Sequence, residues 1–257
     1  MAERRLTGLA LKVGPLGEHD RLLSVLSDDL GISRLAVPGA RRPRSSLAAA
    51  APLTLLELQV GGRSGLARVR QLRVLQSFSG LGACLETLSA AQVLCDLCLQ
   101  LAAEDPVEGL LSTTLLHLER LEAHASNPEL VLAGTVQACV HLLTLGGYGL
   151  PLQSCCLTGD PLNPPLGRWE WRCSLLPDAG FAIDDQPGAA IRLNPSELAL
   201  LQRLTRPNLP RRQDGELMGP PPVWRRLLTV VEIWTRTHLH RPSRALAMLR
   251  ETLQMDG

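Results

Sequence analysis

Aromatic residues are scarce in this chain. Phe, Trp and Tyr make up only 3% of its 257 residues, and residues 1–77 contain none of them. Leu, Val and Ala must therefore build most of the core, which a chain of this length can bury as one large domain or two small ones. Proteins that bind single-stranded nucleic acid commonly stack bases on aromatic side chains. Any nucleic-acid contact within residues 1–77 is therefore expected to be made to phosphates.

Export and membrane signals are also missing. The first residues, MAERRLTGLALKV, lack the apolar core of a secretory signal. No stretch approaches 18 uninterrupted apolar residues, so we expect no membrane span. The chain has seven cysteines, an odd number. Together with the missing export signal, this count predicts reduced thiols and a cytoplasmic location.

Catalytic motifs are absent as well. Neither the phosphate loop GxxxxGK[ST] nor the nucleophile motif GxSxG occurs, and no histidine lies in an HExxH pair. Cys95 and Cys98 have CxxC spacing, but their apolar helical surroundings indicate core positions. Cys155, Cys156 and Cys173 are too few for a closed four-ligand zinc site. We therefore predict no catalysis, no cofactor and no metal, with a Cys-based metalloenzyme as the least favoured alternative.

Charge is abundant but segregated. Residues 1–80 hold 12 basic and 6 acidic residues, a net charge of +6. Residues 81–190 hold 3 basic and 13 acidic residues, a net charge of −10. Residues 191–257 hold 11 basic and 6 acidic residues, a net charge of +5. The overall net charge of +1 is thus a cancellation between regions. Such asymmetry is typical of separate surfaces for different partners.

The first 80 residues have the pattern of a small β-barrel. Alternating apolar residues predict that Leu9, Leu11 and Val13 share one strand face, as do Leu56, Leu58 and Val60. Five short strands favour a barrel of the OB type in residues 1–80, with an SH3-like barrel or a small sandwich as alternatives. The expected strands are Leu6–Val13, Arg21–Ser27, Ile32–Val37, Leu53–Val60 and Leu66–Leu75.

Beyond Gly82 the period becomes helical, so the predicted class is α+β. A helical domain is expected in residues 81–150 and 191–257. Residues 151–190 are rich in Pro and Gly and predict an irregular subdomain, and residues 207–222 a Pro-rich linker. Asn194-Pro195-Ser196-Glu197 has the pattern of a capped helix start. The other expected helices are residues 85–101, Leu110–Leu121, residues 128–145, Val223–Leu239 and Ser243–Leu253.

Arginines cluster in the predicted barrel. The stretch GARRPRSS, Gly39 to Ser46, joins the third and fourth strands. Arginine forks match phosphate oxygens, and acids are few nearby, so a polyanion partner is favoured. Binding should be dominated by the backbone of the polyanion and should depend strongly on salt. On the fifth strand, Arg68 and Arg70 are expected on one face and Arg73 on the other. The candidate residues are Arg34, Arg41, Arg42, Arg44, Arg68, Arg70 and Arg73, and Arg63 is a further basic residue of this region.

The run from Leu6 to Val60 resembles the N-terminal domain of the RecO family of bacterial recombination mediators. GARRPRSS stands where that family carries a GAR-type basic loop. LGGYGLPLQSC (Leu145–Cys155) and HLHRPSRALAML (His238–Leu249) resemble later family segments in the same order. The resemblance implies an OB-fold followed by a helical domain with an inserted zinc-finger-like element. It also implies a non-enzymatic mediator that binds single- and double-stranded DNA, anneals strands, and with RecR loads RecA onto DNA coated by single-strand-binding protein (SSB).

The chain departs from the family pattern in two places. Cys155 matches the first zinc ligand, but Thr158 stands where the second belongs and the later pair is missing, which implies a degenerate element with Cys155 as a remnant ligand position. The stretch Val136–Leu145 lacks the basic residues that some members present to the acidic SSB tail. That contact, or a further DNA contact, is therefore expected elsewhere, for example at Arg225, Arg226 and Arg236. The main alternative function is an adaptor that binds proteins only.

Overall fold

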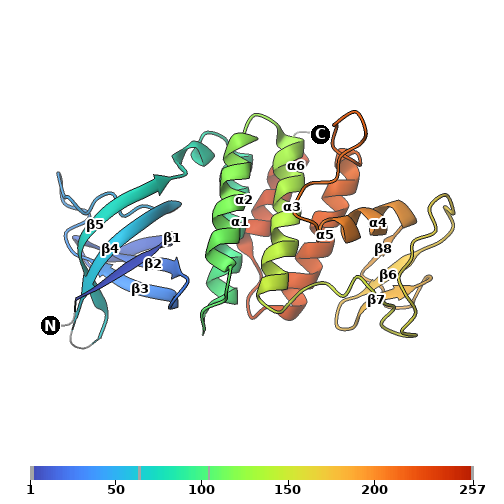
Figure 1. Ribbon diagram of the computed structural model, residues 1–257, viewed down its shortest axis with the longest axis horizontal. Helices are drawn as coiled ribbons and strands as arrows, with labels where there is room; N and C mark the ends of the chain where they lie inside the picture. The colour runs from blue at the N-terminus through green and yellow to red at the C-terminus, as the bar shows by residue number, and fades with distance from the viewer. Residues whose placement is uncertain (1–2, 63–64, 104, 256–257) are drawn as a thin grey trace.

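Five strands at the N-terminal end of the chain close into a barrel (Figure 1). The structure, a computed structural model, describes residues 3–62, 65–103 and 105–255, with side chains as far as Thr252. The strand order is β1-β2-β3-β5-β4, antiparallel except where β3 pairs with β5. This confirms the OB-type barrel and excludes an open sandwich. The strands are β1 (Arg4–Leu16), β2 (Asp20–Ser27), β3 (Gly31–Val37), β4 (Thr54–Gly61) and β5 (Ala67–Ser77).

A β-bulge in β1 changes which side chains fill the barrel. Leu56, Leu58 and Val60 line the interior as expected. Between Ala10 and Lys12, however, the pairing of β1 with β2 shifts register. The extra residue inverts the alternation, because two residues of the bulged strand oppose one on its partner. Val13 therefore packs inside the barrel, whereas Leu9 and Leu11 face the helices. The prediction that Leu9, Leu11 and Val13 share a face is wrong.

The barrel and the helices share a core at their junction. Gly31 begins β3 with a positive φ of +59°. It places the β2–β3 turn close to the end of α1 (Leu85–Leu101), where a Cβ on residue 31 would lie 3.0 Å from the Ala102 carbonyl oxygen. The Ile32 amide donates to that same oxygen at 3.2 Å. Side chains from both sides of the junction pack into one cluster, among them Leu9, Leu11, Leu26, Phe78 and Leu81.

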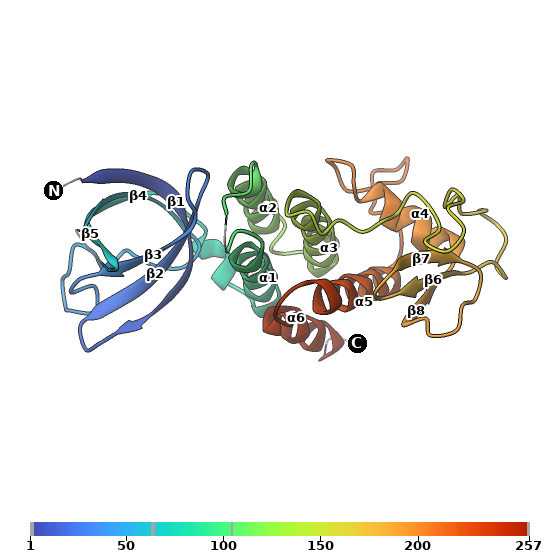
Figure 2. The same cartoon turned by 90° about the horizontal axis from the view of Figure 1, so that it is seen from below.

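Most of the helices pack against one another in a bundle beside the barrel (Figures 1 and 2). Asn127 caps α3, and Asn194 with Glu197 forms the predicted capping box of α4. Cys95 and Cys98 are buried in the core as expected, and burial raises the pKa of Cys98 to about 12. After the short 3₁₀ turn η1 (Ser79–Gly82) and α1 come α2 (Leu110–Ala123), α3 (Pro128–Leu145), α4 (Pro195–Arg203), α5 (Pro221–His238) and α6 (Arg244–Met255).

Within the described residues, α3 is the one helix long and apolar enough to cross a membrane by length and composition. In this protein 61% of that 18-residue window is buried inside the structure. A central helix of a helical bundle can be as long and apolar as a membrane span, because it is apolar on most sides.

Residues 151–193, here called the distal subdomain, lie at the end of the molecule opposite the barrel (Figures 1 and 2). They contain a small antiparallel sheet in the order β7-β6-β8, where an irregular segment was expected. Its strands have only three or four residues, too few to reveal a period of two in the sequence. Cys155, Cys173 and Phe181 are buried within this subdomain. The strands are β6 (Cys173–Leu176), β7 (Gly180–Ile183) and β8 (Ile191–Leu193).

Candidate nucleic-acid interface and a pocket in the helical domain

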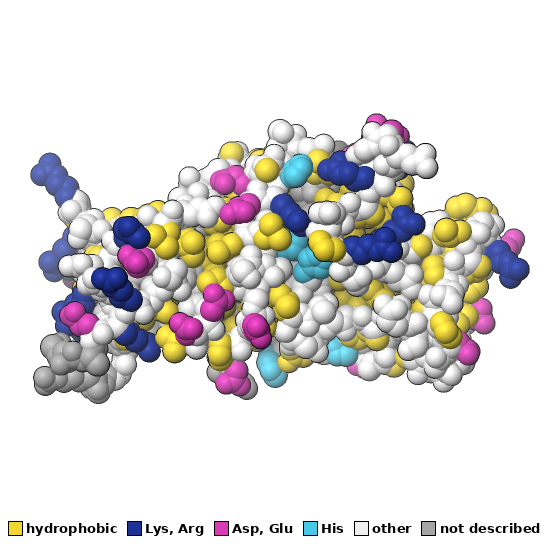
Figure 3. All heavy atoms as spheres, in the orientation of Figure 1, with side chains coloured by type: hydrophobic (Ala, Val, Ile, Leu, Met, Phe, Trp, Pro, Cys, Tyr) yellow, Lys and Arg dark blue, Asp and Glu magenta, His cyan; other side chains and the backbone are white. Residues whose placement is uncertain are grey.

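Three predicted arginines share the outer face of the barrel. Leu35 and Val69 point inward, so their neighbours Arg34, Arg68 and Arg70 point outward and are exposed. Residue 36 of β3 lies opposite Arg68 of β5, which brings Arg34 and Arg68 onto adjacent strands. None of the three pairs with a carboxylate among the described residues. Figure 3 shows basic side chains gathered at this end of the molecule.

Arg73 lies on the same outer face, so the prediction that it lies opposite Arg68 and Arg70 is wrong. The pairing of β4 with β5 shifts register near Val69, and Leu72 packs against the barrel interior as Val69 does. The bulge thus turns Arg73 outward. Its Nε lies 3.3 Å from Glu57 Oε2. The neighbouring carboxylate offsets its charge and makes it the least suited of these arginines to hold phosphate.

The GARRPRSS loop is anchored to the barrel. The Gly39 amide donates to Asp20 Oδ1 at 2.8 Å. Arg21 Nη1 donates to the carbonyls of Ala48 and Ala50, at 3.1 Å and 3.0 Å. These contacts fix both ends of the loop beside β2. The loop is therefore a defined platform for its arginines.

The three arginines of this loop have different surroundings. Arg41 Nη1 donates to the Gly17 carbonyl at 3.2 Å, and its amide donates to the His19 carbonyl at 2.9 Å. Arg41 thereby ties the loop to the β1–β2 turn. Arg42 and Arg44 are exposed, and their guanidinium groups have no hydrogen bond or ion pair among the residues that the structure describes. Arg42 and Arg44 are thus the loop cations best placed to meet a ligand.

Sequence reasoning missed two exposed cations on β1. Arg5 pairs with Gln59 and faces outward, since the next residue, Leu6, lines the barrel. That alternation was visible in the sequence. Lys12 faces outward opposite Ser24, on the side that the alternation of Leu11 and Val13 also indicated. Arg63, the further basic residue of this region, lies outside the described residues.

The turn around Cys155 keeps a compact, hydrogen-bonded shape. The Gly159 amide donates to the Cys155 carbonyl at 2.9 Å, and the Cys155 amide to the Asp160 carbonyl at 2.7 Å. Burial raises the pKa of the Cys155 thiol, but hydrogen bonds from the residues around it, the backbone at Ile183, Thr158 and Leu157 among them, outweigh burial and lower the pKa to about 7.

This turn does not fit a zinc ion. Among the described residues, no three His, Cys, Asp or Glu side chains are grouped as a metal would need. Thr158 instead donates its hydroxyl to Asp160 Oδ2 at 2.7 Å. Within residues 3–62, 65–103 and 105–252, no group of side chains supplies the metal ligands that a Cys-based metalloenzyme would need.

Removal of metal should leave the fold unchanged. The distal subdomain is held by its apolar core and its hydrogen bonds, so we expect a strong chelator not to alter the melting temperature. Calorimetry of the purified protein with and without chelator measures this, with elemental analysis for zinc on the same sample. Stoichiometric zinc, or a lower melting temperature after chelation, would contradict this account.

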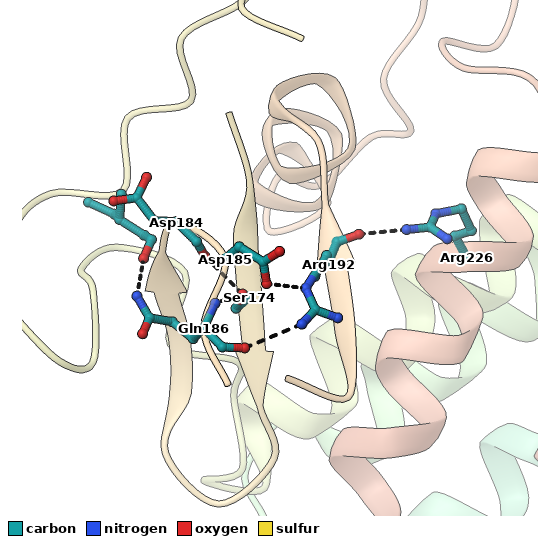
Figure 4. Close-up of polar contacts among 7 residues, drawn as sticks. Ser174, Asp184, Asp185, Gln186, Arg192 and Arg226 are labelled. Carbon is teal, nitrogen blue, oxygen red and sulfur yellow. Dashed lines mark hydrogen bonds and ion pairs between the residues drawn. The ribbon is translucent and has the colours of Figure 1, made fainter. Parts of the chain in front are cut away.

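A polar network joins the distal subdomain to α5 (Figure 4). Ser174 Oγ donates to the Asp184 carbonyl at 2.8 Å, and the Gln186 amide donates to Ser174 Oγ at 3.0 Å. Arg192 pairs with Asp185, and Arg226 of α5 donates to the Arg192 carbonyl at 2.6 Å.

Arg226 has a structural partner that the sequence did not indicate. Its Nε lies 2.6 Å from Oε1 of Glu197, whose side chain is only 5% exposed. Arg226, although 46% exposed, is thus held by partners within the protein, whereas the side chains of Arg225 and Arg236 have no such partner among the described residues. As an external contact, Arg226 is the weakest of the three predicted residues.

Replacement of Arg226 by Ala should destabilise the protein. It leaves the Glu197 carboxylate nearly buried without its cation, a loss of about 2 kcal/mol in the free energy of unfolding. Arg225→Ala is the matched control, because it removes an exposed charge one residue away and should change stability by less than about 0.5 kcal/mol. Urea unfolding of both variants measures the difference. Equal stabilities would refute the structural role.

A pocket of about 350 Å³ opens between α2, α3 and the linker after α4. Leu121, Leu130 and Leu209 supply apolar walls, and Arg120 and Arg211 supply positive charge. Figure 3 shows basic and histidine side chains on this part of the helical domain. The pocket is lined by His117, Arg120, Leu121, His124, Leu130, Gly134, Gln137, Asn208, Leu209 and Arg211.

The linker wall of this pocket is fixed by three side chains. Arg120 Nη1 donates to the Pro207 carbonyl at 2.8 Å, and Gln137 Nε2 donates to the Arg206 carbonyl at 2.9 Å. His141 Nε2 lies 3.1 Å from that same carbonyl oxygen. This pocket leaves no mark in the sequence, because its walls come from three segments far apart in the chain.

One residue that lines the pocket, His117, is paired with a second histidine. His117 Nε2 and His141 Nδ1 are 3.0 Å apart. Burial, and then the nearby charges of His141 and Arg120, lower the pKa of His117 to about 3. His117 is therefore neutral at physiological pH, and the pocket owes its positive charge to Arg120 and Arg211.

A closed OB-type barrel followed by a helical bundle defines a class of two-part, mixed α and β proteins. Residues 1–78 match the domain family described as "Recombination protein O N terminal", and residues 84–247 match "Recombination protein O C terminal". The chain belongs to the RecO family of DNA repair proteins.

Similar proteins cover the chain almost completely. "DNA repair protein RecO" of Synechococcus sp. (strain CC9605) is 85% identical over 98% of both chains. The protein of that name from Parasynechococcus marenigrum (strain WH8102) is 77% identical over 98% of this chain and 94% of its own. The protein of that name from Prochlorococcus marinus (strain MIT 9313) is 68% identical over 99% of this chain and 97% of its own. These relatives confirm the family that the sequence motifs resemble.

Proposed function

We propose that this chain is a non-enzymatic mediator that binds single- and double-stranded DNA in the cytoplasm and anneals complementary strands. The observation that carries the proposal is the outer face of the barrel. Arg34, Arg68 and Arg70 lie there without carboxylate partners among the described residues, and Arg42 and Arg44 add two further exposed cations. A cluster of unpaired guanidinium groups is suited to phosphate oxygens.

The arrangement favours contact with phosphates over recognition of bases. Residues 1–77 contain no aromatic side chain on which a base could stack. Phosphate contacts carry no sequence information of their own. Annealing requires two strands to approach against their mutual repulsion, and cations that neutralise both backbones while leaving bases free serve that purpose.

The pocket between α2 and α3 is our candidate for the acidic C-terminal tail of SSB. Its apolar walls fit a hydrophobic side chain, and Arg120 and Arg211 fit carboxylates. The helix stretch Val136–Leu145 has no basic residue, but α2 and the linker bring these two arginines to the same helix. This places the proposed contact away from Arg225 and Arg236, which remain candidates for a further DNA contact.

Protein partners are assigned to the acidic middle of the chain. Within it, residues 81–150 hold one basic and eight acidic residues, a net charge of −7, which repels DNA and leaves this part of the helical domain free for RecR and for recombinase loading. An adaptor that binds proteins only is the competing function. A gel-shift experiment at modest salt that detects no DNA complex at micromolar protein would favour that adaptor.

Strand annealing on SSB-coated DNA tests the proposal. The wild-type protein should accelerate pairing of complementary strands, and Arg42→Ala/Arg44→Ala should slow it. Gly134→Leu, which fills the tail pocket, should slow annealing only when SSB is present. Equal rates with and without the wild-type protein on bare strands would overturn the annealing function.

A further inference from the structure

One aromatic side chain in this aromatic-poor protein is left in solvent. Of the seven aromatic residues, Phe78, Phe181, Trp224 and Trp234 are buried. Tyr148 and Trp171 are partly buried against the core. Trp169 is 64% exposed. An exposed large apolar side chain is more informative than a buried one, because burial is the default for such groups.

The loop that carries Trp169 is held in a defined shape. The Arg168 amide donates to the Pro165 carbonyl at 3.1 Å, and the Trp171 amide donates to the Arg168 carbonyl at 3.2 Å. The Arg172 guanidinium donates to the carbonyls of Trp169 and Trp171. Residues 164–172, here called the Trp169 loop, therefore present the indole on a fixed backbone.

The residue before Trp169 carries an available positive charge. Arg168 is exposed, and its guanidinium has no hydrogen bond or ion pair among the described residues. Glu170 offsets only one of the two flanking arginines, Arg168 and Arg172. An exposed indole and a free guanidinium on consecutive residues are the combination that can hold an unpaired base and its phosphate.

We propose that the Trp169 loop is a second contact for single-stranded DNA, in which an unpaired base stacks on Trp169 and Arg168 meets the adjacent phosphate. This inference rests on the proposed function and deepens it. The barrel has basic residues but no aromatic side chain within residues 1–77. The Trp169 loop supplies the stacking surface that the barrel lacks.

The location gives this contact a separate role. The distal subdomain and the barrel lie at opposite ends of the molecule, with the helical bundle between them (Figures 1 and 2). The two ends therefore hold separate stretches of single strand. The distal subdomain has three basic and five acidic residues, a net charge of −2. Its contact depends on stacking, so it responds less to salt than the contact at the barrel.

Tryptophan emission during titration with oligothymidylate tests the proposal. Wild-type emission should fall as an unpaired base stacks on Trp169. Trp169→Phe keeps the other three tryptophans and should lose this quenching. Trp169→Ala should weaken binding about tenfold, as expected for loss of one base–aromatic stack, with a similar ratio at low and moderate salt. Leu157→Ala, which truncates another exposed side chain of the distal subdomain, should behave as the wild type.

The outcomes separate this inference from the proposed function. Anisotropy of a labelled oligonucleotide reports binding at any part of the protein. Binding by anisotropy with unchanged wild-type emission overturns the stacking contact and leaves the barrel interface intact. Quenching that persists in Trp169→Phe also overturns the stacking contact. Wild-type tryptophan emission that responds to a protein partner but not to DNA overturns it as well. No binding in either readout overturns both.

Discussion

Replacing Arg42, Arg44 and Arg68 together by Ala is expected to weaken the binding of single-stranded DNA about 100-fold at 0.1 M salt. Each phosphate contact to a single strand contributes about −0.7 to the slope of log K against log salt. Loss of three such contacts should lower the association constant at 0.1 M salt by about two powers of ten. It should also make the slope of log K against log salt shallower by about 2. Fluorescence anisotropy at several salt concentrations measures both quantities.

Arg73 provides the matched control for this prediction. It lies on the same strand and the same outer face as Arg68 and Arg70, but Glu57 offsets its charge at 3.3 Å. We expect Arg70→Ala to weaken binding and Arg73→Ala to have a much smaller effect. Arg41 is left unchanged because it holds the loop through the Gly17 carbonyl. If the triple variant bound DNA as tightly as the wild type, the outer face would not be the interface.

The second large effect is expected at Gly134. Its Cβ position meets only Leu121 Cδ2, at 3.6 Å, so a side chain there projects into the pocket without a clash at its root. Gly134→Leu should fill the pocket and weaken binding of the SSB tail peptide about 10- to 100-fold. That range corresponds to losing the burial of one apolar side chain, about 1.5–3 kcal/mol. Calorimetric titration with the peptide measures it.

Gly134→Ala is the control for this variant. Both substitutions replace glycine within a helix, where glycine costs about 1 kcal/mol relative to Ala, so neither should destabilise α3. Only Leu is large enough to occupy the pocket. DNA binding at the barrel should be unchanged in both variants. Normal peptide binding by Gly134→Leu would show that the tail docks elsewhere, with Arg225 and Arg236 as the next candidates.

Much of the fold could be predicted because its local signals are strong. Glycine-marked turns separate strands that each bury one face, and Asn-Pro pairs begin α3 and α4, so these elements appear where the sequence indicates. The three-stranded sheet was missed because strands as short as Ile191–Leu193 show no clear alternation.

The candidate site was predictable only in part, for a related reason. The arginines of the barrel are visible in the sequence, but the face that each occupies depends on bulges, which insert single residues and leave no compositional mark. Val13 and Arg73 were assigned to the wrong faces on that account. The pocket at Arg120 and Arg211 and the ion pair of Arg226 join segments distant in the chain. Such contacts follow from tertiary packing rather than local pattern.

The salt dependence of DNA binding by the wild-type protein tests the central claim most directly. If the exposed arginines of the barrel hold phosphates, log K should fall linearly with log salt, with a slope of about −2 or steeper for three or more contacts. Affinity for an oligonucleotide should then drop sharply between low and moderate salt, whatever its sequence. A flat salt response, or binding that depends on base sequence but not on salt, would contradict the account.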